Sequence, residues 1–313
     1  MAAISATGKA AQRAAITAED CCDRGNENFF LLRTAEALAD YTEAIRLKPD
    51  YANAYHNRGL AKLKLGRTAE AIADYTEAIR LKPDHAEAYY NRGGAKYNLE
   101  RTAEAIADYT EAIRLKPDYA NAYYNRGVAK RKLGRYEEAI ADYTEVIRLK
   151  PDHAEAYNNR GFAKEKLGRT AEAIADYTEA IRLKPDYANA YYNRGLAKLK
   201  LGRYEEAIAD YTEAIRLKPD YAWAYCYRGK AKYELGRFEE AIADYTEALR
   251  LKPDCIPASS GKLFAEKALA KSAAERPSVA ASAVGAGAIS AHGTGSGGGA
   301  PAVSIPSEKR QKH

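Results

Sequence analysis

The chain has 313 residues, of which 46% are apolar and 29% are charged, and its formal net charge is +6. This ordinary composition supplies enough apolar residues for a sizeable core. The sequence contains no run of about 18 uninterrupted apolar residues, which excludes a helix that spans a membrane.

The net positive charge comes entirely from the two ends of the chain. Residues 18–255 contain 40 Lys and Arg and 40 Asp and Glu, so their formal charge is zero. Residues 1–17 add +2 and residues 256–313 add +4. Because the central region has no net charge, it produces no long-range field that would attract a polyanion, and nucleic-acid binding is not favoured.

The N-terminal segment and the cysteines indicate a reducing, cytoplasmic location. Residues 1–17 are Ala-rich and have no acidic residue, so we expect a flexible leader, with an organelle transit segment as the alternative. The cysteines lack the spacing of a metal or redox motif, and we interpret them as buried or inactive thiols. They are Cys21, Cys22, Cys226 and Cys255.

An internal repeat organises the chain. The tripeptide Lys-Pro-Asp recurs at intervals of 34 residues, with prolines at Pro49, Pro83, Pro117, Pro151, Pro185, Pro219 and Pro253. Such a period predicts tandem copies of one structural unit. The seven units are 18–51, 52–85, 86–119, 120–153, 154–187, 188–221 and 222–255.

Each unit is predicted to form two helices. In the second unit we expect a first helix over 52–65, with Asp50 as its N-cap. Gly66 follows this helix and suits a left-handed C-terminal turn. A second helix is expected over 68–82, and Pro83 stops it.

The helical periodicity assigns the buried faces. We number each unit from its first residue, so Ala52 is position 1. Apolar or small residues recur at positions 3, 4, 8, 10 and 14 of the first helix and at 20, 21, 24, 27, 28 and 30 of the second. The turn glycine at position 15 is replaced by Leu32 and Glu100, which should cost a little under ~1 kcal/mol each. One unit cannot bury these faces alone, so neighbouring units must stack.

This pattern resembles the tetratricopeptide repeat family. The matching residues are an aromatic at position 4, Gly at 8, Ala at 20, an aromatic at 24, Ala at 27 and Pro at 32, with Cys21 replacing the first aromatic. The resemblance implies an all-α fold, namely an α-solenoid of seven tandem 34-residue helix-turn-helix repeats in a right-handed superhelix. It also implies a concave groove lined by the first helices, which binds another protein.

Two positions depart from the family. Position 7 is Arg in all seven units and position 11 is Lys in six, where the family usually has Leu and an aromatic residue. A buried cation needs a partner, so we predict a structural ion pair. Glu at 19 and 26 and Asp at 23 recur in every unit; the helical wheel places Asp at 23 on the exposed side, which leaves the choice of partner open.

The residues after the repeats divide into two parts. Residues 256–275 have an apolar stripe and are predicted to form a single C-terminal capping helix that covers the last unit. Residues 276–313 are rich in Ala, Gly and Ser and end in a basic sequence, which is typical of a disordered tail.

Nothing in the repeats indicates catalysis. The sequence has five histidines but no HExxH motif, and near-identical units place the same groups at every rung rather than assembling one unique centre. We therefore expect a protein that is not an enzyme and that uses no cofactor and no metal.

The candidate binding residues lie on the variable side of the first helices. Position 6 is Asn in five successive units, and an amide can bond both the C=O and the N–H of a peptide unit. Some members of the family hold peptides with such an asparagine ladder, and this sequence looks similar; the alternative is that these amides bond neighbouring helices or water. The candidates are Asn57, Asn91, Asn125, Asn159 and Asn193, with Tyr90, Tyr124 and Tyr192 at position 5 and Asn53, Asn121 and Asn189 at position 2.

The expected partner is an extended segment of another protein. The carboxylate clamp of the family, which grips an acidic C-terminus, is incomplete because position 5 is never Lys and position 6 is never Arg. Two alternatives remain: docking of folded partners by the convex or end surfaces, and RNA binding. Self-association stays possible, and no membrane partner is expected.

Overall fold

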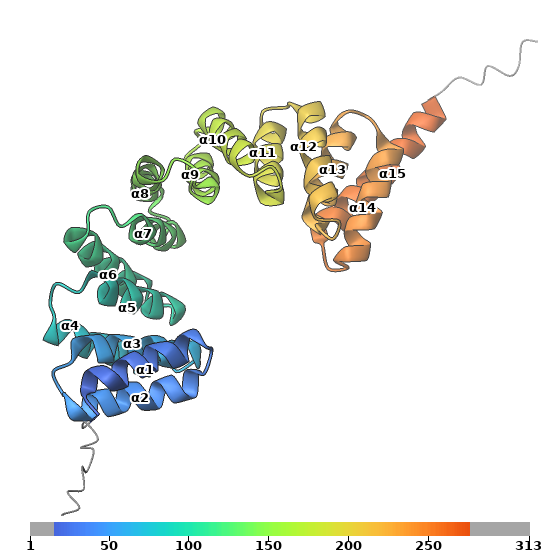
Figure 1. Ribbon diagram of the computed structural model, residues 1–313. Coiled ribbons are helices and arrows are strands. Elements are labelled where there is room, and N and C mark those ends of the chain that lie inside the picture. Colours follow the sequence, from blue (N-terminus) through green and yellow to red (C-terminus); the bar gives the residue numbers. More distant parts are fainter. Residues whose placement is uncertain (1–15, 276–313) are drawn as a thin grey trace, which may run out of the picture. The chain divides into compact units, whose positions relative to one another are not determined.

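The computed structural model describes residues 16–275 and contains fifteen α-helices and no strand in that range (Figure 1). The described residues divide into two units, of which the first is residues 16–269 and the second is the C-terminal end of α15, residues 270–275. Most of the expected leader and all of the expected disordered tail lie outside the described residues.

The helices alternate between the two kinds expected from each repeat. The first helices are α1 (Ala18–Phe30), α3 (Ala52–Lys64), α5 (Ala86–Asn98), α7 (Ala120–Lys132), α9 (Ala154–Lys166), α11 (Ala188–Lys200) and α13 (Ala222–Glu234). The second helices are α2 (Thr34–Leu47), α4 (Thr68–Leu81), α6 (Thr102–Leu115), α8 (Tyr136–Leu149), α10 (Thr170–Leu183), α12 (Tyr204–Leu217) and α14 (Phe238–Leu251). The last helix is α15 (Ile256–Glu275).

Neighbouring helices pack in chain order, as a solenoid requires. Each first helix contacts the second helix of its own unit, and each second helix from α2 to α12 contacts the first helix of the next unit. Successive first helices from α1 to α13 also contact each other. This regular helix-turn-helix stacking confirms the predicted all-α solenoid.

The turn between the helices confirms the expected backbone. Gly66 has φ +75°, and the residues that replace glycine, Leu32 and Glu100, are held at φ 62° and 61°. The left-handed region strains a residue with a Cβ atom, which is the expected penalty at these two turns.

The predicted N-cap is wrong. Helix α3 begins after Tyr51, which makes no side-chain cap bond, and Asp50 lies one residue too early to cap it. Instead, the Tyr51 carbonyl accepts bonds from the amides of Ala54 (3.0 Å) and Tyr55 (3.3 Å). The Tyr51 side chain packs against the core, and its backbone, at φ −83° and ψ 84°, is not yet helical.

The core consists of tyrosines that lie against glycines. Tyr143, at position 24, is fully buried, and a Cβ atom on Gly127 would lie only 2.8 Å from Cε1 of its ring. Gly at position 8 is therefore required by the tyrosine at position 24 of the same unit. The small residues at 20 and 27 are also fully buried, including Val146, where the other units have Ala.

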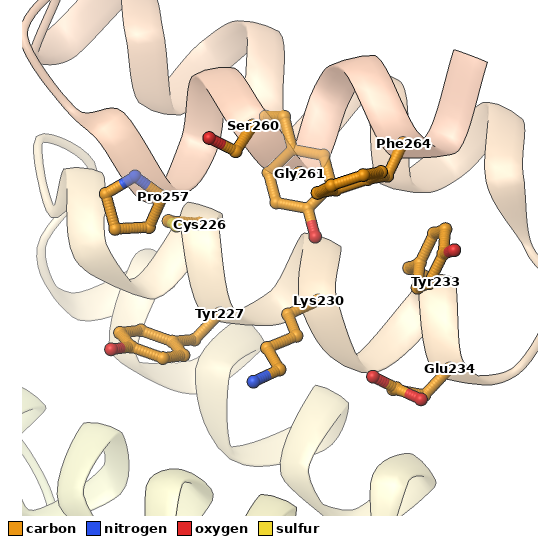
Figure 2. A pocket seen from close by; sticks show the side chains of 10 residues that line it. Cys226, Tyr227, Lys230, Tyr233, Glu234, Pro257, Ser260, Gly261 and Phe264 are labelled. Carbon is orange, nitrogen blue, oxygen red and sulfur yellow. The ribbon is translucent and has the colours of Figure 1, made fainter. Parts of the chain in front are cut away.

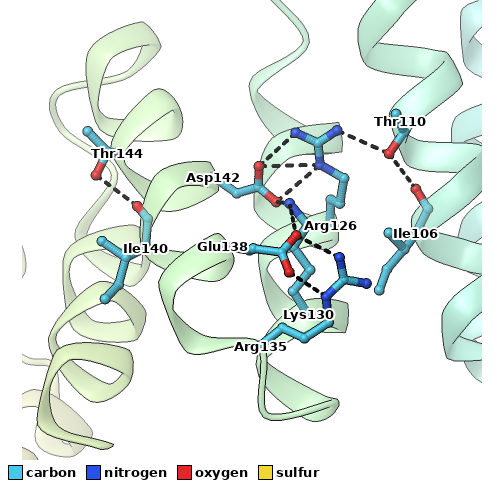
Figure 3. Close-up of polar contacts among 9 residues, drawn as sticks. All are labelled: Ile106, Thr110, Arg126, Lys130, Arg135, Glu138, Ile140, Asp142 and Thr144. Atoms are coloured by element: carbon cyan, nitrogen blue, oxygen red, sulfur yellow. Dashed lines mark hydrogen bonds and ion pairs between the residues drawn. The ribbon is translucent and has the colours of Figure 1, made fainter. Parts of the chain in front are cut away.

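A charged cluster links the two helices of each unit (Figure 3). Asp142 accepts from Nη2 of Arg126 at 2.7 Å and from Nζ of Lys130 at 2.8 Å, and its side chain is only 4% exposed. Arg126 also donates to Oγ1 of Thr110 in the preceding unit at 3.1 Å. The same Arg–Asp–Lys cluster recurs in the second to seventh units; in the first, Asn28 replaces Lys and donates to Asp40.

This cluster confirms the structural ion pair and identifies its acid. The partner of Arg at position 7 is Asp at position 23, whereas the wheel had placed that Asp on the exposed side, which is wrong. A wheel describes one isolated helix, and here the flank of the second helix is covered by the side chains of its own first helix. Glu at 26 pairs on the surface with the arginine three residues later in every unit, and Glu at 19 pairs with the arginine three residues earlier in the second to sixth units.

Candidate peptide-binding face

The variable positions of the first helices form one continuous surface, which we call the first-helix face (positions 2, 5, 6, 9, 12 and 13 of α1 to α13). Pockets lie along it, each lined by residues of successive first helices. The pocket between α5 and α7 has a volume of about 280 Å³. Hollows therefore recur along this face from α1 to α13.

The asparagines at position 6 lie on this face and connect successive units. The last four donate from Nδ2 to the residue at position 5 of the preceding unit, whereas Asn57 donates to Asn26 at position 9 and, at 3.9 Å, to Sγ of Cys22 at position 5. The alternative of bonding between neighbouring helices therefore holds for part of each amide. The bonds are Asn57 to Asn26 (2.9 Å, at position 9 rather than 5), Asn91 to His56 (2.9 Å), Asn125 to Tyr90 (2.9 Å), Asn159 to Tyr124 (2.9 Å) and Asn193 to Asn158 (3.0 Å).

The amide oxygens remain available in four of the five asparagines. Within residues 16–275, no hydrogen bond reaches Oδ1 of Asn91, Asn125, Asn159 or Asn193, whereas Oδ1 of Asn57 faces Nδ1 of His56 at 3.2 Å. An amide has two N–H donors and an oxygen with two lone pairs. The interhelical bond thus orients each amide and leaves its acceptor and one donor for a ligand.

The tyrosines at position 5 are partly buried beside these amides. Tyr90 and Tyr192 pack at 4.9 Å, centroid to centroid, against the tyrosine at position 34 of their own units, and Tyr124 stacks on His153 at 5.0 Å. Burial raises the pKa of all three phenols above the ordinary value. All three are therefore neutral hydroxyls with partly exposed rings, and those of Tyr90 and Tyr124 accept from Asn125 and Asn159.

The asparagines at position 2 lie at the edge of the face. All three are exposed. Oδ1 of Asn121 accepts from Lys150 at 3.3 Å, and Oδ1 of Asn189 accepts from the Tyr221 hydroxyl at 3.2 Å. The structure thus brings the position-5 and position-6 residues together and leaves the position-2 residues outside their hydrogen-bond network.

His56 replaces tyrosine in this network and makes it sensitive to acid. Nε2 accepts from Asn91 and Nδ1 faces Oδ1 of Asn57, which requires the neutral ring with its proton on Nδ1. Burial, and secondarily the charge of His85, lowers the pKa of His56 from 6.5 to about 4.

We predict that His56 destabilises the fold as the pH decreases. The unfolded chain binds the proton below pH 6.5 and the folded chain only near pH 4. Stability should therefore be full above pH 6.5 and decrease by at most about 1.4 kcal/mol per pH unit down to about 4. Urea unfolding of the wild type and His56→Tyr across this range measures the effect, because Tyr occupies the same position in other units. Parallel losses in both proteins would contradict the assignment.

A pocket at the C-terminal end of the face was not expected from the sequence (Figure 2). It has a volume of about 320 Å³ and is formed by α13, α14 and α15. Its aromatic lining residues are Tyr227, Tyr233, Tyr245 and Phe264. Gly261 is essential there, because a Cβ atom would lie 2.5 Å from Cζ of Tyr245. The sequence contains one signal of this pocket. If residue 256 is counted as position 1 of an eighth unit, Gly261 is its position 6, where the second to seventh units have Asn or Tyr.

The four cysteines are buried and unpaired, as interpreted from their spacing. Cys226 and Cys255 occupy positions 5 and 34 of the seventh unit, where other units place two rings in contact. Burial and the neighbouring Cys255 raise the pKa of Cys226 to about 12. Such a thiol is a weak nucleophile.

Two classes of site find no support in residues 16–275. No cluster of three or more His, Cys, Asp or Glu side chains there could ligate a metal ion. In the same range, no helix combines the length and the apolar character needed to cross a bilayer.

Comparison with known proteins places these features in a family. Models described as TPR repeat match residues 33–66, 129–168, 166–202 and 197–236, and models described as tetratricopeptide repeat match 56–120, 108–141 and 222–255. Together they cover the chain continuously from residue 33 to 255. A comparison with curated proteins gives no match.

Solved structures show the same architecture. The crystal structure of YrrB, described as a TPR protein with an unusual peptide-binding site, is 25% identical and covers 59% of this chain and 95% of its own, with a TM-score of 0.54. MamA is 26% identical over 55% of this chain and 93% of its own, with a TM-score of 0.51. A tetratricopeptide repeat protein from Parabacteroides merdae, 20% identical over 80% of this chain and 98% of its own, has a TM-score of 0.57 and shows the fold alone. The family models span most of the chain, and the structure consists of the stacked helix pairs typical of this family. This protein therefore belongs to the tetratricopeptide repeat family.

Proposed function

We propose that the protein is a non-catalytic scaffold that binds an extended segment of another protein along the first-helix face. The four buried, unpaired cysteines suit a reducing compartment such as the cytoplasm. The peptide-binding site for which YrrB is described supports this type of partner by similarity.

The observation that carries the proposal is the series of free amide oxygens. Asn91, Asn125, Asn159 and Asn193 lie at equivalent positions of successive first helices, and each is oriented by a bond to the preceding unit. Oxygens fixed in this way accept main-chain N–H groups without losing much side-chain entropy on binding. Because they recognise the backbone, they suit an extended chain of varied sequence.

The electrostatics of the face agree with a ligand of low net charge. Acidic residues at position 2 pair with lysines at position 31 of the same unit, as Glu155 does with Lys184 at 3.0 Å. Farther along the first helices, Lys132 pairs with Glu100 and Lys200 with Glu165. Lys64, Arg131, Lys166 and Lys230 form no ion pair among the described residues. The six cations of the face are nevertheless matched by six carboxylates, so the face has no net charge that would attract a polyanion, and protein is favoured over RNA as the partner.

Alanine substitution of three amides tests the proposal. A short peptide selected from a displayed random library on the full chain serves as the probe. Asn91→Ala/Asn125→Ala/Asn159→Ala should weaken its Kd at least about 10-fold, because each lost bond contributes about 0.5–1.5 kcal/mol. Fluorescence anisotropy measures the Kd, and circular dichroism verifies the helix content.

A matched control separates binding from structure. Tyr90→Phe/Tyr124→Phe removes the acceptors that orient Asn125 and Asn159 but keeps the amide oxygens, so it should weaken the Kd by about threefold, clearly less than the triple Asn variant does. Equal binding by the wild type and the triple Asn variant would show that the ladder does not hold the peptide. Strong weakening by salt would instead indicate a charged ligand such as RNA.

A further inference from the structure

One unit lacks a side chain on the first-helix face. Position 9 is Gly94 in α5, whereas the other units have Asn26, Leu60, Val128, Phe162, Leu196 and Lys230 there. The pocket between α5 and α7 opens above this glycine. Its lining residues are Leu63, Tyr90, Asn91, Gly94, Tyr97, Asn98, Tyr109, Asn125 and Val128.

The pocket exposes a hydroxyl that is covered in the second, fourth and sixth units. Tyr109 is only 2% exposed, and its hydroxyl lies 3.7 Å from the place where a Cβ atom of Gly94 would be. No hydrogen bond to this hydroxyl occurs among the described residues. The equivalent hydroxyls of Tyr75, Tyr143 and Tyr211 are buried and have no hydrogen-bond partner within residues 16–275. In the third unit, Gly94 has no side chain to cover the Tyr109 hydroxyl, so Tyr109 forms part of the pocket wall.

Other units show how this hydroxyl is satisfied when a polar group is near. The Tyr41 hydroxyl donates to Oδ1 of Asn26 at 3.0 Å, and the Tyr177 hydroxyl donates to Oε2 of Glu165 at 3.1 Å. In both cases the partner comes from the first helix of the same unit. In the third unit the first helix supplies no such group, so a ligand can supply it.

The lining of the pocket determines the chemistry of its occupant. All nine lining residues are uncharged, so an ionised side chain would lose hydration without gaining a counter-charge. Lys132 lies over the ring of Tyr97 at 5.0 Å and is paired with Glu100. Tyr90, Tyr97 and Tyr109 offer aromatic surface, and Oδ1 of Asn91 and Asn125 offer acceptors. The volume of about 280 Å³ admits one large side chain.

We propose that this pocket binds a neutral aromatic side chain with a hydrogen-bond donor at its tip, tyrosine or tryptophan, from the segment held on the first-helix face. This inference rests on the proposed function and adds a position-specific preference to it. The rings of the pocket contact the aromatic body, and the donor reaches the Tyr109 hydroxyl or an Asn oxygen. Peptides that lack such a residue still engage the amide series but lose this contact.

Filling the pocket tests the proposal. Gly94→Leu introduces the residue of Leu60 and Leu196, and its Cβ would be at ordinary contact distance from Tyr109. Leucine also favours a helix more than glycine does, so the variant should fold. Peptides selected on the wild type should share a Tyr or Trp at one position. We expect Gly94→Leu to weaken their Kd at least about 10-fold and to abolish that preference in a new selection.

A double-mutant cycle tests the hydrogen bond. Tyr109→Phe keeps the shape of the pocket, and a Tyr→Phe analogue of the selected peptide keeps the ring. Each change alone should weaken binding by about threefold to 10-fold, and the two changes together should weaken it little more than either change alone. In a second measurement, N-acetyl-tyrosinamide should shift the amide NMR signal of Gly94, which is assigned by its absence from the Gly94→Leu spectrum.

The outcomes separate this inference from the proposed function. If Gly94→Leu binds the peptide as tightly as the wild type while the triple Asn variant does not, the pocket assignment is wrong and the ladder stands. If the triple Asn variant binds normally while Gly94→Leu does not, the ladder is wrong and the pocket stands. No shared aromatic position and an unshifted Gly94 signal would also overturn the pocket.

Discussion

Replacing Asp142 by Ala should lower the free energy of unfolding by about 3–5 kcal/mol, the cost of leaving buried cations without their acid. Arg126 and Lys130 both depend on this carboxylate, and their side chains are 15% and 11% exposed. Lys130 keeps only Glu138, at 3.8 Å. Because a repeat array is coupled through neighbouring units, loss in the fourth unit should also broaden or split the urea transition seen by circular dichroism.

A surface ion pair in the same helix is the control. Glu145 pairs with Arg148 at 2.8 Å, but these side chains are 39% and 63% exposed. Glu145→Ala should therefore change the stability by no more than about 0.5 kcal/mol, because exposed pairs are screened by water and salt. Equal losses in Asp142→Ala and Glu145→Ala would contradict a structural role for the buried cluster.

Tyr143→Ala should produce a loss of similar size, about 3–5 kcal/mol, because it removes a fully buried ring and leaves a cavity beside Gly127. Tyr143→Phe should be neutral or stabilising, since the hydroxyl that it removes is buried and finds no hydrogen-bond partner in the described part of the chain. Urea midpoints of the two variants measure both effects. This pair of results separates the packing of the ring from the desolvation of its hydroxyl.

Tyr177 provides the matched comparison for the hydroxyl. Its hydroxyl donates to Glu165 at 3.1 Å, so Tyr177→Phe removes a bond and should cost about 1 kcal/mol. If Tyr143→Phe and Tyr177→Phe destabilise the protein equally, the hydrogen-bond state of these hydroxyls has no effect on stability.

The candidate site was predictable in its location but not in its bonding. The Asn period placed Asn91, Asn125 and Asn159 on one face, and the structure keeps them there. Their Nδ2 groups, however, bond residues 35 positions earlier in the chain, a relation that no single helix reveals. Gly94 was visible in the sequence, but its pocket depends on α5 and α7 lying side by side over Tyr109.

The sequence by itself determined the repeat, the helix pairs and their apolar faces, because period, turn glycine and proline act within one unit. Only the tertiary structure decided that Asp142 and its counterparts are buried partners of Arg and Lys. It also decided that Tyr51, not Asp50, is the N-cap residue of α3. Finally, it decided that the Asn side chains donate from Nδ2 to the preceding unit while, among the described residues, Oδ1 accepts no bond in four of the five. The physical reason is that burial and hydrogen bonding in a stacked array depend on the helices on both sides. A helical wheel predicts the side of the helix from which a side chain projects, but not which residue of a neighbouring helix that side chain contacts.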